Sequence, residues 1–279
     1  MFECRNCEAH RAEPFYAGVP DRFHGYPGAF NYVRCAGCAL VQLEEIPADL
    51  GAYYGDYRVH GRESALYRLL RRMTIGHSYH QPPGRGRAML DYGAGSGWYL
   101  KAMADAGWRA TGYELDPAHA ARLSERVGLP VLSGDALDAY PAAFDLITLN
   151  FVFEHLEQPR RVLDRLTRCL KPGGELYLSV PNIEGREARL FKEHWFHLDP
   201  PRHVTFFTKP QLSGLLRDAG YDDIAIKDLA VPTGFAGSVA YRLWDRFERL
   251  TWYGAVVPGL VFSRVIRDGN FAVTARLKG

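Results

Sequence analysis

The sequence predicts an α/β fold with a doubly wound, mostly parallel sheet, preceded by a small cysteine-rich segment. Three observations lead to this prediction. A short apolar stretch ending at Asp91 runs into a glycine loop and then into a helical pattern. From residue 87 onward strand-like and helical patterns alternate, which is typical of parallel sheets. Near the start, four cysteines fall into two C-x-x-C pairs.

Composition and charge limit the possible function classes. The chain has 279 residues, of which 47% are hydrophobic, enough for a substantial core. Its 34 basic and 32 acidic residues leave a net charge of +2, so charge gives no strong signal for nucleic-acid binding. No signal peptide is expected at the start, and no apolar run reaches the roughly 20 residues of a transmembrane helix. A cytoplasmic protein is therefore expected.

The cysteine pairs are Cys4 with Cys7 and Cys35 with Cys38, separated by 27 residues. Together they supply four thiolates at the spacing that a tetrahedral zinc site requires. The segment resembles a zinc ribbon. Since four cysteines leave no open position on the metal, we expect a structural Zn²⁺. Ribbons also bind nucleic acids or proteins, so a macromolecular partner stays an alternative.

The predicted domain boundaries follow from these patterns. The zinc-ribbon-like segment covers residues 1–45, and residues 46–86 form a connector with an expected helix at 63–73. The α/β domain covers residues 87–279, with an insertion at about 232–268.

The glycine loop after the first core strand reads Gly93-x-Gly95-x-Gly97. A dinucleotide site would read G-x-G-x-x-G and place a pyrophosphate on the helix N-terminus. Asp91 would repel a pyrophosphate but suits a ligand that carries an ammonium group. S-adenosylmethionine carries an α-ammonium and a sulfonium. Residues 89–100 therefore resemble motif I of the class I S-adenosylmethionine-dependent methyltransferases.

The next strand ends in Glu114, which could accept hydrogen bonds from both ribose hydroxyls of the cofactor. A helix follows, with Asp116 as its N-cap. The resemblance further implies that Leu115 flanks the adenine and that Asp135, beside Ala136, accepts from the adenine amino group. A purely turn-forming role for Asp135 stays open. Asn150 and Phe151 end the fourth strand, over the ligand crevice of such a sheet.

The later core also resembles the methyltransferases that act on small molecules. The resemblance covers the strand at 144–150, the turn at 171–174 and the strand at 175–180, and it implies a seven-stranded Rossmann-like sheet whose last strand is antiparallel. A helix opening at Thr208 with a capping box and ending at Gly220 is predicted from the residues themselves.

Residues 191–207 are rich in aromatic and histidine residues and read as too polar for a core, so we expect them on the acceptor side. The sulfonium is already a strong electrophile, so alignment is the main requirement. A hydroxyl acceptor would gain from a base, and His155 and His203 lead the candidates, ahead of His194 and His197. Related metal-assisted enzymes have a Glu-x-x-Glu-His cluster, but Phe151 stands at the first Glu position.

The tail carries an apolar helical stripe from Val239 to Leu250. It predicts a helix that packs on the core or on a second copy, and peripheral membrane contact is the alternative. The expected function is methyl transfer from S-adenosylmethionine to a small-molecule acceptor, such as a hydroxyl of a secondary metabolite, sugar or quinone-like compound. A non-catalytic regulatory or scaffold protein and a nicotinamide-dependent dehydrogenase are the alternatives. The oligomeric state is left open.

Overall fold

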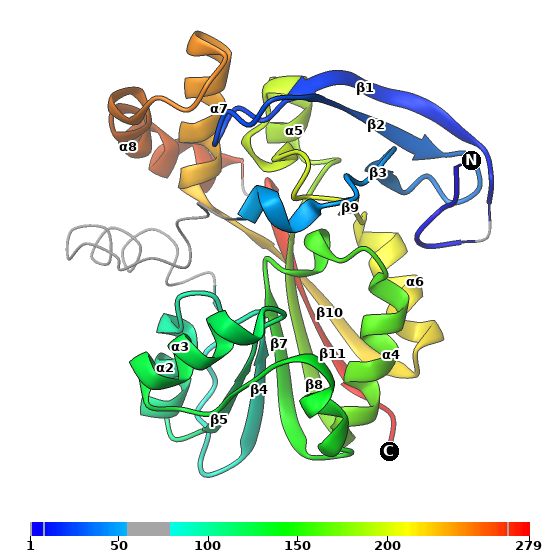
Figure 1. Ribbon diagram of the computed structural model, residues 1–279, viewed down its shortest axis with the longest axis vertical. Coiled ribbons are helices and arrows are strands. Elements are labelled where there is room, and N and C mark those ends of the chain that lie inside the picture. Colours follow the sequence, from blue (N-terminus) through cyan, green and yellow to red (C-terminus); the bar gives the residue numbers. More distant parts are fainter. Residues whose placement is uncertain (1, 8, 55–78, 267) are drawn as a thin grey trace.

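The computed structural model describes residues 2–7, 9–54, 79–266 and 268–279. Two sheets organise this part of the chain (Figure 1): a seven-stranded sheet in the lower half of the view and a four-stranded sheet at the top. The helix predicted at 63–73 lies outside the described residues.

The large sheet has the strand order β10-β11-β8-β7-β4-β5-β6. The strands are β4 (Ala88–Tyr92), β5 (Arg109–Tyr113), β6 (Val131–Leu132), β7 (Phe144–Asn150), β8 (Leu170–Pro181), β10 (Tyr221–Leu229) and β11 (Asn270–Leu277). Neighbours from β6 to β8 are parallel, and β11 lies antiparallel between β8 and β10. The predicted doubly wound, mostly parallel sheet of seven strands is confirmed, as is its antiparallel last strand.

Four helices cover this sheet: α2 (Trp98–Asp105), α3 (Pro117–Val127), α4 (Pro159–Cys169) and α6 (Lys209–Asp218). Figure 1 shows α2 and α3 on one side and α4 and α6 on the other. Alternating strand residues face the two sides, as a pleated strand requires. Met89 and Leu146 pack with α2 and α3, whereas Leu90 and Ile147 pack with α4 and α6. The chain therefore passes from one layer to the other between β4 and β7, where α/β folds place their ligands.

The helix ends follow the predicted caps. The Asp116 side chain accepts a hydrogen bond from the amide of Ala118, and Gly128 ends α3 in the left-handed region with φ 68°. Thr208 and Gln211 form the predicted capping box of α6. One strand start differs from prediction, because β8 begins directly after α4 at Leu170 and includes the turn-like residues before Glu175.

The four-stranded sheet joins the N-terminal segment to the core. Its strands are β1 (Ala12–Pro20), β2 (Ala29–Cys35), β3 (Val41–Leu43) and β9 (Thr205–Phe206), all antiparallel neighbours in that order. Val41 pairs with Phe206, so the last strand comes from the acceptor-side loop of the core. The ribbon-like segment thus shares a sheet with the core, and the domain boundary near residue 45 stays a prediction.

The insertion consists of two helices, α7 (Pro232–Trp244) and α8 (Arg249–Val265). The predicted single stripe from Val239 to Leu250 is wrong. Asp245 takes a left-handed φ of 53° and ends α7, and the Glu248 carboxylate then accepts from the amides of Leu250 and Thr251 to start α8. Among the described residues, no helix is long and apolar enough to cross a membrane.

Candidate active site

The glycine loop follows β4 and leads into α2. Gly93, Gly95 and Gly97 all have positive φ, at 78°, 56° and 76°. A Cβ on Gly93 would lie 2.6 Å from Val152, and one on Gly97 would lie 2.7 Å from Leu123. Side chains at these positions would meet both backbone strain and steric clash. The loop therefore keeps its backbone open at the carboxyl end of the parallel strands.

Asp91 lies at the end of β4 and is almost fully buried. Its Oδ1 accepts a hydrogen bond from the Thr148 hydroxyl on the neighbouring strand β7, at 3.0 Å. Burial, followed by the nearby Glu114 charge, raises the pKa of Asp91 to about 7, although the Thr148 contact acts in the other direction. A cationic group placed beside this carboxylate would relieve the burial cost.

Glu114 follows β5 and faces the glycine loop, where its Oε1 accepts a hydrogen bond from the Gly95 amide. The His119 ring on α3 braces the same loop, with Nε2 donating to the Gly95 carbonyl at 3.0 Å. Burial raises the pKa of Glu114. Two carboxylates, those of Glu114 and Asp91, thus flank one loop from adjacent strands.

The other predicted cofactor residues lie around this loop at strand ends. Leu115 follows β5 and is 80% exposed. Asp135 and Ala136 lie exposed in the short helix η4 (Gly134–Ala139), after β6. Phe151 follows β7 with φ 55°. The structure thus brings the predicted set to the carboxyl ends of β4, β5, β6 and β7.

Asn150 has an unusual environment at the end of β7. Both polar atoms of its side chain are buried and make no well-formed hydrogen bond with the described residues, although the amide lies near enough to Asp91 to lower the pKa of that carboxyl. Buried amides are nearly always paired in native structures. An unpaired amide beside a carboxylate and an open glycine loop fits a polar ligand with an ammonium group, as S-adenosylmethionine has.

His155 and His203 meet just beyond these strand ends. His155 lies in the short helix η5 (Phe153–His155), and its ring contacts that of His203 edge to face. The His155 Nδ1 lies 3.0 Å from the Arg202 carbonyl, and the His203 Nδ1 lies 2.7 Å from the His197 carbonyl. Because carbonyls only accept, both Nδ1 atoms carry the proton, which leaves each Nε2 with its lone pair.

The two rings are neutral in this environment. Burial lowers the pKa of His155 to about 4 and lowers that of His203 well below its usual value. Tyr54, at the end of the short helix η1 (Leu50–Tyr54), places its hydroxyl 3.0 Å from the His155 Nδ1.

Glu154 lies next to this pair and is buried. Neither carboxylate oxygen has a hydrogen-bond partner among the described residues, and burial raises the pKa to about 8. Glu154, His155 and His203 each offer one atom within 4.8 Å of the others. The remaining position of the related metal-assisted cluster is filled by Phe151, as the sequence showed.

The chain is similar in sequence to a known protein family. The family model described as "Methyltransferase domain" matches residues 59–226, more than half of the chain. The chain belongs to this methyltransferase domain family. The assignment sets aside the dehydrogenase alternative and agrees with a glycine loop flanked by two carboxylates.

Individual relatives support the assignment over parts of their length. A ubiquinone biosynthesis O-methyltransferase of Idiomarina loihiensis is 28% identical over 52% of this chain and 65% of the relative. An uncharacterized methyltransferase of Mycobacterium leprae is 42% identical over 37% of this chain and 40% of the relative. The chain thus spans less than two thirds of these relatives. A Haemonchus contortus phosphoethanolamine N-methyltransferase structure shares the fold, with a TM-score of 0.53 and 17% identity over 81% of this chain and 60% of the other.

The acceptor-side loop of this methyltransferase domain is far more buried than predicted. Residues 191–207 were expected to be too polar for a core, and this expectation is wrong: Trp195, Arg202, Val204 and Phe206 are almost fully buried. The N-terminal sheet covers the loop, and the Tyr32 hydroxyl contacts the carbonyls of Leu198 and His203 at 2.7 and 3.0 Å. His197 is also buried, whereas His194 lies near the surface beside Asp245.

Sequence reasoning missed the charged cluster that holds this loop. The Arg202 guanidinium bonds both oxygens of Asp21, at 2.7 and 3.0 Å, and also bonds Asp199. Arg202 and Asp21 side chains are completely buried. An arginine in a histidine-rich loop was visible in the sequence, but its partner 181 positions away had no sequence signal.

The four predicted zinc ligands come together at the other end of the small sheet. Cys4 Sγ lies 3.5 Å from Cys38 Sγ, and Cys7 Sγ lies 3.7 Å from Cys35 Sγ. All four sulfurs fall within 4.8 Å of one another. These distances suit four thiolates around one tetrahedral ion.

Proposed function

We propose that this domain transfers the methyl group of S-adenosylmethionine to a hydroxyl of a small molecule. The observation that carries the proposal is the placement of two neutral histidines, His155 and His203. They lie just beyond the end of β7, which pairs with β4, and β4 leads into the glycine loop that Asp91 and Glu114 flank. Family membership supports methyl transfer in general. The unprotonated Nε2 atoms support an acceptor that must lose a proton.

The cofactor would be held by the chain's own polar groups. The Asp91 carboxylate and the unpaired Asn150 amide suit the amino-acid end of S-adenosylmethionine. Glu114 suits the ribose hydroxyls, and the exposed Leu115 suits one face of the adenine. Asp135 and Ala136, in η4, stay proposed contacts of the adenine ring.

In the proposed reaction, the acceptor oxygen forms a bond to the methyl carbon while the carbon–sulfur bond breaks. The bonding electron pair stays on sulfur, so the positively charged sulfonium becomes the neutral thioether of S-adenosylhomocysteine. A histidine Nε2 takes the hydroxyl proton. The buried Nδ1 contacts to the carbonyls of Arg202 and His197 hold each ring in the tautomer that this step needs.

We further propose a phenolic, quinone-like acceptor. One relative is named for O-methylation in ubiquinone biosynthesis. The ring of Phe206 lies edge to face against that of His203, which gives the surroundings of this histidine an apolar character that suits a ring compound.

The cysteine cluster would hold one Zn²⁺ that stabilises the N-terminal sheet. Four cysteine ligands complete a tetrahedral ion and leave no open position, so the metal supplies folding energy and takes no part in methyl transfer. The shared strand pair of Val41 and Phe206 favours this structural role, because the sheet is used to cover the core.

The proposed activity is tested by incubating the full chain with S-adenosylmethionine and matched panels of catechols, simple phenols, sugars and amines. Formation of S-adenosylhomocysteine and the product mass would be measured. We expect turnover with phenolic hydroxyls, loss in Gly95→Val, and a strong decrease in His203→Ala. Turnover confined to amines and unchanged in His203→Ala would contradict the hydroxyl proposal.

A further inference from the structure

Helix α8 carries a row of exposed apolar residues among its described side chains. Among the α8 side chains that the structure describes, the exposed ones beyond Arg249 are uncharged: Leu250, Tyr253, Gly254, Val257, Pro258, Val261 and Val265; the side chain of Arg264, the remaining basic residue of the helix, is outside this set. These positions recur every three or four residues and so share one face of the helix. Val257 is 67% exposed and Val265 is 70% exposed. Contiguous apolar surface of this kind marks an interaction site.

The opposite face of α8 is firmly packed. Ala255 and Val256 form a small core with Ala236 of α7, and the rings of Phe262 and Phe235 lie 4.0 Å apart. The helix therefore uses one apolar face for folding and has a second apolar face that no described residue covers. The exposed face is thus a separate feature of the helix.

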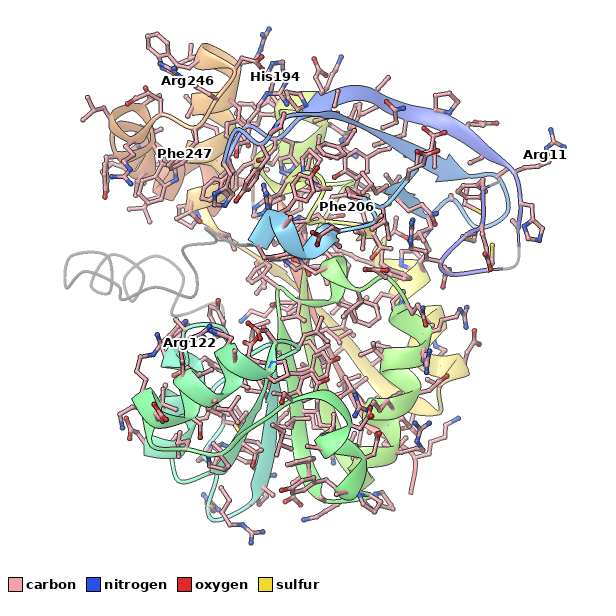
Figure 2. The ribbon with its side chains drawn as sticks, in the orientation of Figure 1. Arg11, Arg122, His194, Phe206, Arg246 and Phe247 are labelled. Atoms are coloured by element: carbon pink, nitrogen blue, oxygen red, sulfur yellow. The ribbon has the colours of Figure 1, made fainter. Side chains whose placement is uncertain are left out.

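The turn that leads into α8 is basic. Arg242, Arg246 and Arg249 are exposed there, and Figure 2 labels Arg246 at the outer edge of the molecule. The two acidic residues of the turn are already engaged. Asp245 accepts from Arg22 at 2.6 Å, and Glu248 caps α8 by accepting from two backbone amides. Because Asp245 is paired with Arg22 and only Glu248 remains to offset the three arginines, the turn carries a net positive charge beside the apolar face.

Two aromatic residues lie where this charge meets the apolar face. Trp244 is 56% exposed and Tyr253 is 49% exposed. Amphipathic aromatic side chains of this kind favour the boundary between lipid headgroups and acyl chains.

We propose that α8 and the α7–α8 turn dock on an anionic lipid surface. The apolar face would enter the boundary of the acyl chains, the arginines would lie on lipid phosphates, and Trp244 and Tyr253 would sit between. Charge complementarity favours this occupant over a second copy of the chain, since the same turn of a second copy would also carry a net positive charge.

The docked insertion would sit directly on the acceptor-side loop. The Phe196 amide donates to the Ser238 hydroxyl of α7 at 2.9 Å, and a Cβ on Gly237 would lie 2.1 Å from the Phe196 ring. The short helix η7 (Phe196–Leu198) precedes His203 by a few residues. Lipid binding would thus hold the histidine loop close to the membrane. This inference does not depend on the proposed methyl transfer.

Flotation of the full chain with vesicles tests the proposal. Vesicles of phosphatidylcholine, with or without phosphatidylglycerol, would be used at low and high salt. We expect binding to the anionic vesicles, weakened by salt, and a decrease of about tenfold or more in a Val257→Asp/Val261→Asp variant. Arg246→Glu/Arg249→Glu should weaken binding to anionic vesicles by about fivefold per arginine.

Ile226→Asp is the matched control, because Ile226 is an exposed apolar residue on β10, away from α8. It should float as the wild type does. S-adenosylhomocysteine affinity, measured for every variant, reports that the fold is intact. The proposal is overturned if the wild type stays unbound with both vesicle types, or if Val257→Asp/Val261→Asp floats unchanged. A wild-type dimer in sedimentation that this double variant dissociates would assign the face to a second copy.

Discussion

The ring of His155 meets the ring of His203 edge to face, with 4.5 Å between the ring centroids. Each Nδ1 is held by a backbone carbonyl from the same loop, so in both rings Nε2 carries the lone pair. The two side chains come from different segments of the chain, yet they meet just beyond the end of β7.

We predict that His203→Ala and His155→Ala each lower turnover of a hydroxyl acceptor by about 10²–10⁴-fold, the range for general acid–base catalysis. The pKa of His155, at about 4, keeps the ring neutral at neutral pH, so its variant should show its loss across the whole range from pH 6 to pH 8. Steady-state rates across this range provide the check. Full activity of both variants would show that alignment of the acceptor is sufficient.

Asp91 should make cofactor binding dependent on pH. Its pKa is raised to about 7 by burial, and the ammonium of S-adenosylmethionine needs the carboxylate form. Affinity should therefore fall as pH drops below 7, by at most about tenfold per pH unit. Titration calorimetry with S-adenosylhomocysteine at pH 5.5 to pH 8.5 measures this. Asp91→Asn should bind weakly at every pH, and an equal slope in that variant would assign the effect to another group.

The raised pKa of Asp91 also makes the free energy of unfolding depend on pH, in the direction opposite to that of cofactor affinity. Because the pKa of Asp91 in the folded chain exceeds its usual value of 3.8, the native state holds a proton that the unfolded state has lost between about pH 4 and pH 7. The Asp91 contribution to the free energy of unfolding is therefore largest in acid and decreases as pH rises through 7. Asp91→Asn should be more stable relative to wild type at pH 8 than at pH 5, as measured by urea denaturation.

Zinc removal should lower turnover of the acceptor more than it lowers cofactor affinity. The cysteine cluster holds the small sheet, and β3 of that sheet pairs with β9, directly after His203. Chelation, or Cys35→Ser, should lower turnover while S-adenosylhomocysteine affinity stays within about threefold, since binding and catalysis use different groups. Elemental analysis should give one zinc per wild-type chain. Full zinc content in Cys35→Ser would contradict the ligand assignment.

Arg202 should be a major source of stability for the loop. Its guanidinium and Asp21 are buried together, and breaking a buried pair from one side costs about 3–5 kcal/mol. Arg202→Ala should lose an amount of this order in urea denaturation. Replacing both residues, as Arg202→Met with Asp21→Leu, should recover much of the loss. No recovery in the double variant would mean that other bonds carry the stability, either those of Arg202 with Asp199 or those that Asp21 accepts from the amides of Phe23 and His24.

Local patterns in the sequence predicted most of the α/β core. The cap at Asp116 and the capping box at Thr208 predicted helix starts because these signals act over three or four residues. Asp91, Glu114 and the glycine loop were recognisable because they follow apolar strands directly.

The remaining features depend on contacts between distant segments. The pairing of β3 with β9 and the Arg202–Asp21 contact buried a loop whose composition indicated exposure. The orphaned Glu154 and Asn150 also have no sequence signal, because an unpaired group is defined by what surrounds it. The break at Asp245 was missed since a left-handed aspartate is uncommon within an apolar helical stripe.

The central claim is a division of labour between the glycine-loop side, which binds the cofactor, and the histidine side, which serves the acceptor. Titration calorimetry with S-adenosylhomocysteine on Glu114→Ala, Gly95→Val and His203→Ala tests it most directly. We predict no measurable binding in Gly95→Val, a loss of about 1–3 kcal/mol in Glu114→Ala, and wild-type affinity in His203→Ala. Equal losses of affinity in Glu114→Ala and His203→Ala would contradict the account.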